Sequence, residues 1–207
     1  FGSQKLELNL SVKEDASAPA EISITKMLGA DQEATTLTVN FNELNITDDS
    51  WSYEITYPQQ PEGWLTATKS LDNSMGHLSL VGEELSCGIY RASIKISYET
   101  AGGISSSVYV PVTYTIDSTS PVVYKALPNL QYAGKPIQMT LSGCGFSGLS
   151  SDTAEIPGLE LTSFSVNNNY EMEIFANAVE QPKTLSVGFV EQSSEPATVT
   201  VLEQNSY

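Results

Sequence analysis

One hairpin-like stretch, residues 85–116, constrains the fold of this chain more than any other part of the sequence. Apolar and aromatic residues alternate with polar ones from residue 90 to residue 98, and again from residue 108 to residue 116. Successive side chains of a strand point to opposite faces, so each half predicts a strand with one buried and one solvated face. The polar segment between them carries Gly102-Gly103, a pair that tolerates the positive φ of a hairpin turn. The stretch predicts two long antiparallel strands.

The same alternation recurs along the rest of the chain, and Gly-, Pro- and Asn-rich turns separate its segments. We expect about eight strands before residue 117, including one at residues 6–12, and about seven short strands after it. No segment predicts a helix of three turns. The fold class that this pattern predicts is all-β, with two tandem immunoglobulin-like β-sandwich domains. The expected strands lie at residues 6–12, 21–25, 35–41, 51–57, 64–68, 77–81, 90–98, 108–116, 122–124, 137–141, 159–166, 170–176, 185–189 and 197–202.

The composition of residues 117–121 is typical of a linker, because Asp117-Ser118-Thr119-Ser120-Pro121 is short, polar and ended by proline. A chain of 207 residues fits one or two domains. We therefore predict a first domain at residues 1–117 and a second at residues 118–207.

The charge balance bears on the partners of the protein. The formal net charge is −16, from 25 acidic and 9 basic residues, and such a surface repels nucleic-acid phosphates and anionic membranes. No apolar run is long enough for a membrane-spanning helix. No signal peptide is recognisable and the sequence does not begin with Met, so we expect a mature chain or a piece of a longer one. The low charge density with many small polar residues favours a secreted or cell-surface protein.

The two cysteines, Cys87 and Cys144, fall one in each predicted domain and are too far apart for a metal knuckle. Two unpaired thiols are the first expectation. A disulfide between the domains is the alternative, which secretion would permit. A catalytic thiol is a third interpretation, although the single histidine, His77, has no obvious partner pattern.

The first domain resembles BACON-type bacterial immunoglobulin-like modules over residues 35–117. This resemblance implies a spacer or binding module beside glycan-active or adhesive domains in secreted bacterial proteins. The matching residues are Trp51, Trp64-Leu65 after a Pro-rich bend, the pattern Leu85-x-x-Gly88-x-Tyr90-x-Ala92-x-Ile94, and Val110-Pro111-Val112-Thr113-Tyr114.

The second domain resembles the IPT/TIG immunoglobulin-like family, with Cys144 where that family usually has a small or polar residue. The resemblance implies a structural or adhesive module of a cell-surface protein. The residues that match are Pro121, Gly134, Ile137, Leu141, Gly143, Gly145 and Phe146.

Four aromatic residues flank a Pro-rich bend and are the candidate ligand-binding residues: Trp51, Tyr53, Tyr57 and Trp64. If exposed, these rings would stack on the apolar faces of sugars. The alternative is that both tryptophans fill the sandwich core, as large aromatic residues generally do.

Metal, cofactor and catalytic sites are not predicted. Asp48-Asp49 and Glu83-Glu84 are adjacent acid pairs in predicted loops, without the spacing of a calcium loop. No triad can be drawn without His77, which we place at a strand end, and no Gly-rich phosphate loop precedes a helix.

The function predicted from these features is a non-catalytic structural or adhesion module whose partners are neighbouring domains of a larger surface protein or a glycan. The alternative is a carbohydrate-binding module that uses the aromatic residues around Trp51 and Trp64. A fragment of a glycosidase or protease is the third hypothesis.

Overall fold

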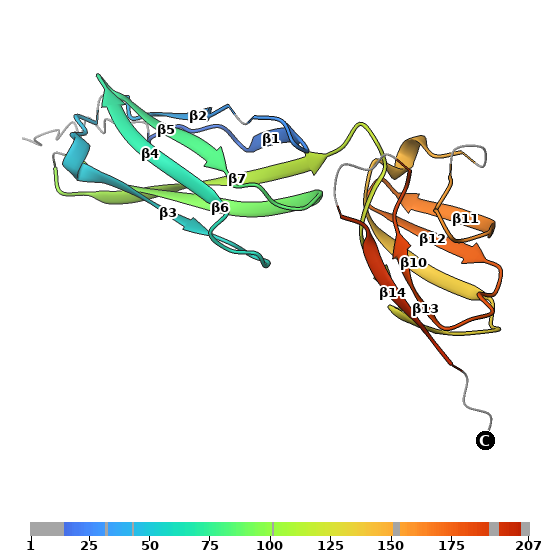
Figure 1. Cartoon of the computed structure of the whole chain (residues 1–207). Helices are drawn as coiled ribbons and strands as arrows, with labels where there is room; N and C mark the ends of the chain where they lie inside the picture. The colour runs from blue at the N-terminus through green and yellow to red at the C-terminus, as the bar shows by residue number, and fades with distance from the viewer. Residues whose placement is uncertain are drawn as a thin grey trace, which may run out of the picture. The chain divides into compact units, whose positions relative to one another are not determined.

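The computed structural model describes residues 15–31, 33–42, 44–100, 102–150, 154–190 and 195–203. These residues form fourteen strands and two short 3-10 helices, η1 (Asp48–Ser50) and η2 (Phe146–Gly148) (Figure 1). The predicted all-β fold is therefore confirmed. The strand expected at residues 6–12 lies outside the described residues.

By their contacts, the residues divide into two compact units. The first holds the described residues up to Ile24, Gln32–Glu83 and Arg91–Thr113. The second holds Thr25–Asp31, Glu84–Tyr90 and the described residues from Tyr114 onward. Three stretches that precede the predicted linker thus belong to the second unit: Thr25–Asp31, Glu84–Tyr90 and Tyr114–Ile116.

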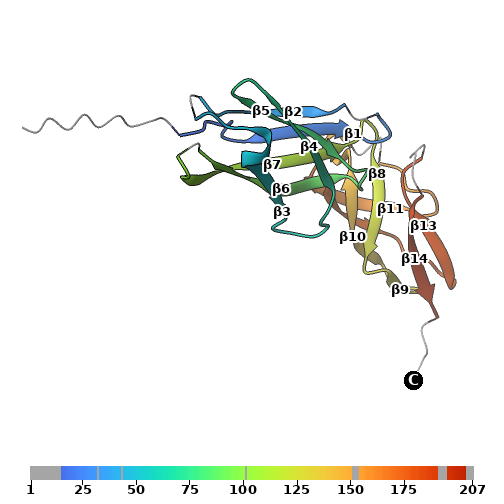
Figure 2. The ribbon, with the colours of Figure 1, turned by 90° about the vertical axis from the view of Figure 1, so that its left-hand side faces the viewer.

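Seven strands build the first sandwich, although the contacts group one end of β1, β6 and β7 (Thr25–Met27, Gly88–Tyr90 and Tyr114–Asp117) with the second unit. One sheet has the order β1-β7-β6-β3 and the other β2-β5-β4 (Figures 1 and 2). Strands β3-β6-β7 correspond to C-F-G of an immunoglobulin domain and β2-β5-β4 to B-E-D, with the first strand placed beside the last. The strand bounds are β1 (Ile22–Met27), β2 (Thr35–Asn40), β3 (Trp51–Thr56), β4 (Leu65–Asp72), β5 (Met75–Gly82), β6 (Gly88–Glu99) and β7 (Ser105–Asp117).

The core of the first sandwich lies between its sheets, because the alternating apolar positions of both sheets are buried. Leu37 and Leu78 contribute from one sheet and Ile94 and Val112 from the other, each at most 1% exposed. The predicted hairpin is present as β6 and β7, with both strands one to three residues longer at their ends than the alternation indicated.

The second sandwich has the sheets β11-β12-β10-β8 and β13-β14-β9. They correspond to D-E-B-A and F-G-A′ of an immunoglobulin domain, and β9 runs parallel to β14. Between η2 and β11, where strand C would run, the described residues form no strand. The strand bounds are β8 (Val122–Leu127), β9 (Leu130–Tyr132), β10 (Ile137–Cys144), β11 (Leu161–Asn168), β12 (Glu171–Ala176), β13 (Lys183–Val187) and β14 (Ala197–Leu202).

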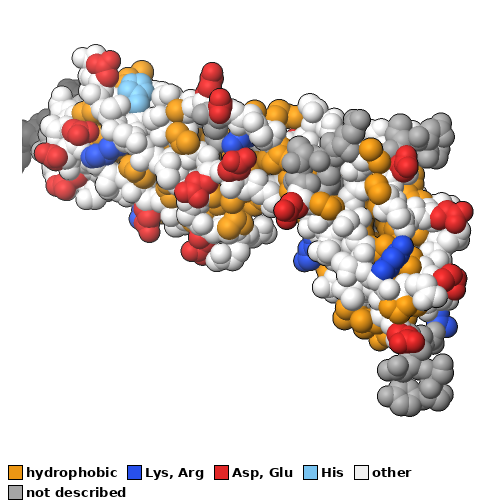
Figure 3. Space-filling view, in the orientation of Figure 1, with side chains coloured by type: hydrophobic (Ala, Val, Ile, Leu, Met, Phe, Trp, Pro, Cys, Tyr) orange, Lys and Arg blue, Asp and Glu red, His pale blue; other side chains and the backbone are white. Residues whose placement is uncertain are grey.

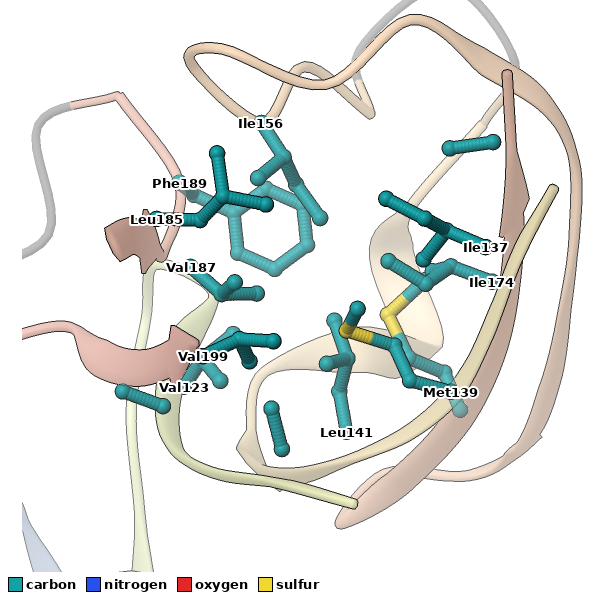
Figure 4. Close-up of a cluster of buried hydrophobic side chains, with 14 of the residues drawn as sticks. Val123, Ile137, Met139, Leu141, Ile156, Ile174, Leu185, Val187, Phe189 and Val199 are labelled. Atoms are coloured by element: carbon teal, nitrogen blue, oxygen red, sulfur yellow. The ribbon is translucent and has the colours of Figure 1, made fainter. Parts of the chain in front are cut away.

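The core of the second sandwich joins side chains from both of its sheets (Figure 4). Met139 and Ile174 face Val187 and Val199 across it. Ile156, from the segment without a strand, is also in this core and is 1% exposed. The described residues between η2 and β11 therefore help to cover the core although they add no strand to either sheet.

One loop expectation needs correction. Residues 128–134, which lie outside the strands expected from the sequence, contain β9, whose three residues pair with Thr200, Val201 and Leu202 of β14. A three-residue strand offers too few positions for an alternation to be recognised, and this strand pairs with a segment about 70 residues away.

Candidate functional site

Both candidate tryptophans lie in the core of the first sandwich. Trp51 is 2% exposed and Trp64 is 1% exposed. The Trp51 ring lies 5.6 Å from the ring of Phe41, and the Trp64 ring lies 5.7 Å from that of Tyr57, measured between centroids. This corrects the expectation of an exposed indole platform, because neither ring presents a face to solvent; the alternative, that both tryptophans fill the core, holds.

Tyr53 and Tyr57 are half-buried and connect the two sheets. The Tyr53 hydroxyl donates a hydrogen bond to the carbonyl of Ala67. The Tyr57 hydroxyl donates to the carbonyl of Leu65 at 3.1 Å and accepts from its N–H at 3.3 Å. Both acceptors belong to β4 in the opposite sheet, so the hydroxyl of each phenol is held against that sheet.

The ammonium group of Lys69, in β4, lies over the Trp51 ring. Its Nζ lies 5.2 Å from the ring centroid and donates to the carbonyls of Asp48, at 2.6 Å, and Trp51, at 3.0 Å. The Asp48 carboxylate lies 3.9 Å from the same Nζ. Within the described chain, Trp51 Nε1 is a buried polar atom without a hydrogen-bond partner. This end of the sandwich is thus closed by a lysine over an indole.

The groups weighed for catalysis or metal binding are not brought together. His77 is the third residue of β5, and its Nδ1 lies 3.2 Å from Oγ1 of Thr38, its neighbour in register on β2. Asp48 and Asp49 begin η1, and Glu83 and Glu84 follow β5. No group of three or more His, Cys, Asp or Glu residues within the described ranges is placed to hold a metal ion.

Cys87 and Cys144 form a disulfide, which corrects the first expectation of two unpaired thiols and confirms the alternative that the two residues are bridged. Cys144 ends β10 and is fully buried. Cys87 lies in Glu84–Tyr90, which the contacts assign to the second unit, so the bridge is internal to that unit. The signals for pairing in the sequence were the even number of cysteines and the composition of a secreted protein.

Tyrosine side chains lie beside the segment that carries Cys87. The Tyr124 hydroxyl lies 3.5 Å from Cys87 Sγ, and the rings of Tyr90 and Tyr114 are 6.4 Å apart. Burial raises the pKa of both Tyr114 and Tyr124 above the usual value for a phenol, and the nearby Glu84 carboxylate raises them further. The segment that carries Cys87 is therefore packed against phenols that are held in their neutral form.

Asp117, predicted to open the linker, is fastened within the second unit. Its carbonyl accepts from the N–H of Leu28 at 2.7 Å. Its Oδ1 accepts from the N–H of Ser118 at 2.7 Å and from Nδ2 of Asn169 at 2.8 Å. Burial, followed by the Asp117 carboxylate, raises the pKa of Tyr170. The first residue of the predicted linker is therefore held in place by hydrogen bonds.

An open hollow of about 450 Å³ lies on the first unit, beside the ends of β3, β6 and β7. Short hydroxyl side chains and two carboxylates line much of it: Asp49, Ser52, Ser97, Glu99, Ser105 and Ser107. Lys95 also lines it, and its Nζ lies 6.0 Å from the ring centroid of Tyr109. Tyr109 is 60% exposed. Sequence analysis did not single out Lys95 or Tyr109, since each stands on the polar side of an ordinary alternation.

Comparison with known proteins gave similar folds only. No family model matches the sequence, and no curated protein matches it. Among solved structures, the human desmocollin-1 ectodomain is 14% identical, with a TM-score of 0.44, over 91% of this chain and 40% of that one. The Escherichia coli adhesin FdeC is 12% identical, with a TM-score of 0.33, over 90% and 66%.

A third structure is the Bacteroides ovatus protein SGBP-B in complex with a mixed-linkage heptasaccharide, which is 15% identical, with a TM-score of 0.29, over 92% of this chain and 48% of that one. The chain thus spans about half the length of two of these proteins. Identities and TM-scores this low carry no functional argument. No helix in the described part of the chain is long and apolar enough to cross a membrane.

Proposed function

We propose that this chain is a non-catalytic structural or adhesion module of a secreted or cell-surface bacterial protein. In this proposal residues 1–117 are a BACON-like domain and residues 118–207 an IPT/TIG-like domain. The observation that supports it is that the side chains most suited to binding or catalysis have structural roles. Trp51 and Trp64 fill a core, Cys87 is bridged to Cys144, and His77 contacts a threonine.

The disulfide supports the proposed location. Disulfides persist in oxidising compartments and are rare where the cytosol keeps thiols reduced. Cys144 is fully buried and Cys87 is half-buried, so the bridge is only partly open to reductants in the folded chain. Acidic side chains are more frequent than basic ones on the face seen in Figure 3. An excess of one charge helps to keep a protein soluble, which agrees with the proposed location.

The non-catalytic role is tested by incubating the chain with a panel of polysaccharides and unfolded proteins and following the release of products. We expect no turnover. Hydrolysis that persists through repeated purification and is abolished by His77→Ala, with folding unchanged, would contradict the proposal. Protease accessibility of the parent protein on intact cells tests the location, and protection until lysis would count against it.

Carbohydrate binding is a second candidate function, and the exposed Tyr109 beside the hydroxyl-lined hollow favours it. The buried indoles of Trp51 and Trp64 do not support the version built on those rings. Fluorescence separates the two versions: emission typical of buried indole, unchanged by a bound oligosaccharide, agrees with a site away from the tryptophans. A large spectral shift on binding would restore them as contact residues.

A further inference from the structure

We propose that the outer face of strands β3, β6 and β7 in the first unit binds a neutral oligosaccharide. One sugar ring stacks on Tyr109, and the rest of the oligosaccharide lies in the adjoining hollow. This inference rests on the carbohydrate-binding candidate above and gives it a site that contains neither tryptophan. The structural role of the module does not depend on it.

The strand register builds the hollow. Ser52 of β3 stands opposite Ser97 of β6, and Glu54 stands opposite Lys95 one step along the same face. On β7, which neighbours β6, Ser105 and Ser107 share a face with Tyr109, because alternate residues of a strand point the same way. Short serine side chains at one end of this face, and longer side chains next to them, leave the open volume of about 450 Å³.

Tyr109 supplies the apolar contact that a sugar ring needs. The residue is 60% exposed, so much of its ring is open to solvent. The Lys95 Nζ lies 6.0 Å from its centroid, within the range of a cation–π interaction, which restrains the ring. Sugars present C–H groups on one or both ring faces, and an aromatic ring with a polar tip can cover such a face while its hydroxyl remains solvated.

The polar groups around the hollow match the hydroxyls of a sugar. Serine hydroxyls both donate and accept, the Asp49 and Glu99 carboxylates accept, and the Lys95 ammonium donates. No ion pair joins Lys95 to Glu54 in the described structure although the two are in register, so the ammonium has donors available for a ligand. The net charge of −16 and the two carboxylates disfavour an anionic chain, which is why the proposed ligand is neutral.

The test is a glycan array probed with the complete chain, followed by calorimetric titration with the neutral oligosaccharide that binds best. We expect Tyr109→Ala to weaken binding at least tenfold, and Ser107→Arg, which fills the hollow from the surface, to do the same. The matched control is Tyr132→Ala, which removes a 55% exposed tyrosine from β9 of the second unit and should leave the affinity unchanged. Thermal unfolding of each variant shows whether its fold is intact.

The outcomes separate this site from the structural role. An array without any neutral glycan bound would overturn the site and leave the module's structural role as it stands. Full binding by both Tyr109→Ala and Ser107→Arg would also overturn it, as would equal losses in Tyr132→Ala. If a folded Tyr109→Ala chain loses binding while Ser107→Arg retains it, the part of the proposal that places the sugar chain in the hollow is wrong.

Discussion

A Cβ atom on Gly76 would lie 2.6 Å from Cε2 of Phe41. Phe41 is fully buried, and its ring contacts those of Trp51 and Tyr98 at centroid distances of 5.6 and 5.5 Å. The ring therefore has no free space into which to rotate, because protein cores are packed as closely as organic crystals. Glycine at position 76 is required by this aromatic cluster, which makes it a sensitive probe of the first core.

Gly76→Ala should destabilise the first unit by about 1–3 kcal/mol, the usual cost of inserting a methyl group into a packed core. Urea unfolding followed by tryptophan fluorescence measures this, since Trp51 belongs to the same cluster. Gly102→Ala is the control, because a Cβ there meets only Thr100 Oγ1 at 3.8 Å. Equal losses in the two variants would show that the Phe41 contact is not the cause.

Gly143→Ala should destabilise the second unit by more, about 3 kcal/mol or above, because a Cβ there would overlap the backbone carbonyl of Val122. A backbone group on a paired strand cannot rotate aside as a side chain can, and β8 and β10 pair at this point across a register shift. The loss is measured as the shift in the urea midpoint. Gly148→Ala, where a Cβ meets nothing within 4 Å, should keep the parent midpoint, and a stable Gly143→Ala chain would contradict the packing described here.

Stability should fall at alkaline pH. Burial raises the pKa of Tyr114, Tyr124 and Tyr170, so the fold favours the neutral phenol over the phenolate. The stability that these groups contribute is complete below about pH 10, the pKa of an unfolded tyrosine, and is lost as the pH rises through the higher folded pKa values. The Tm measured from pH 8 to pH 11 should drop above pH 10, and less steeply in Tyr124→Phe. A flat profile would contradict the assignment.

The strands could be predicted from the sequence because their signal is local. Alternation over residues 90–98 and 197–202 is set by one buried face and needs no knowledge of the partner strand. The strand β9 was not predicted, because its three residues become a strand only through pairing with Thr200–Leu202.

The candidate site was harder to predict than the fold. The sequence around Trp51 and Trp64 is the same whether the rings face the core or the solvent. Only the packing of the two sheets decides that both rings are buried. Whether Cys87 pairs with Cys144 is likewise set by where Glu84–Tyr90 packs, which is a tertiary property. Lys95 and Tyr109 come together across neighbouring strands of a sheet, a relation that no spacing within one strand reveals.

Removing the bridge should destabilise the second unit. The two cysteines are separated by 57 residues, and a loop of this length corresponds to about 4 kcal/mol of chain entropy in the unfolded state. The double variant Cys87→Ser, Cys144→Ser should unfold at lower urea than the parent chain under oxidising conditions. With excess reductant during refolding the two proteins should converge, and a difference that persists there would come from the serine substitutions and not from the bridge.

The most direct test of the account is the state of the two cysteines in protein recovered from the compartment in which it matures. The chain is denatured without reductant, its thiols are alkylated, and its peptides are identified by mass spectrometry. We predict that the peptide containing Cys87 is recovered covalently joined to the peptide containing Cys144, with neither residue alkylated. Recovery of both peptides separate and fully alkylated would contradict the disulfide and would count against the proposed extracellular location.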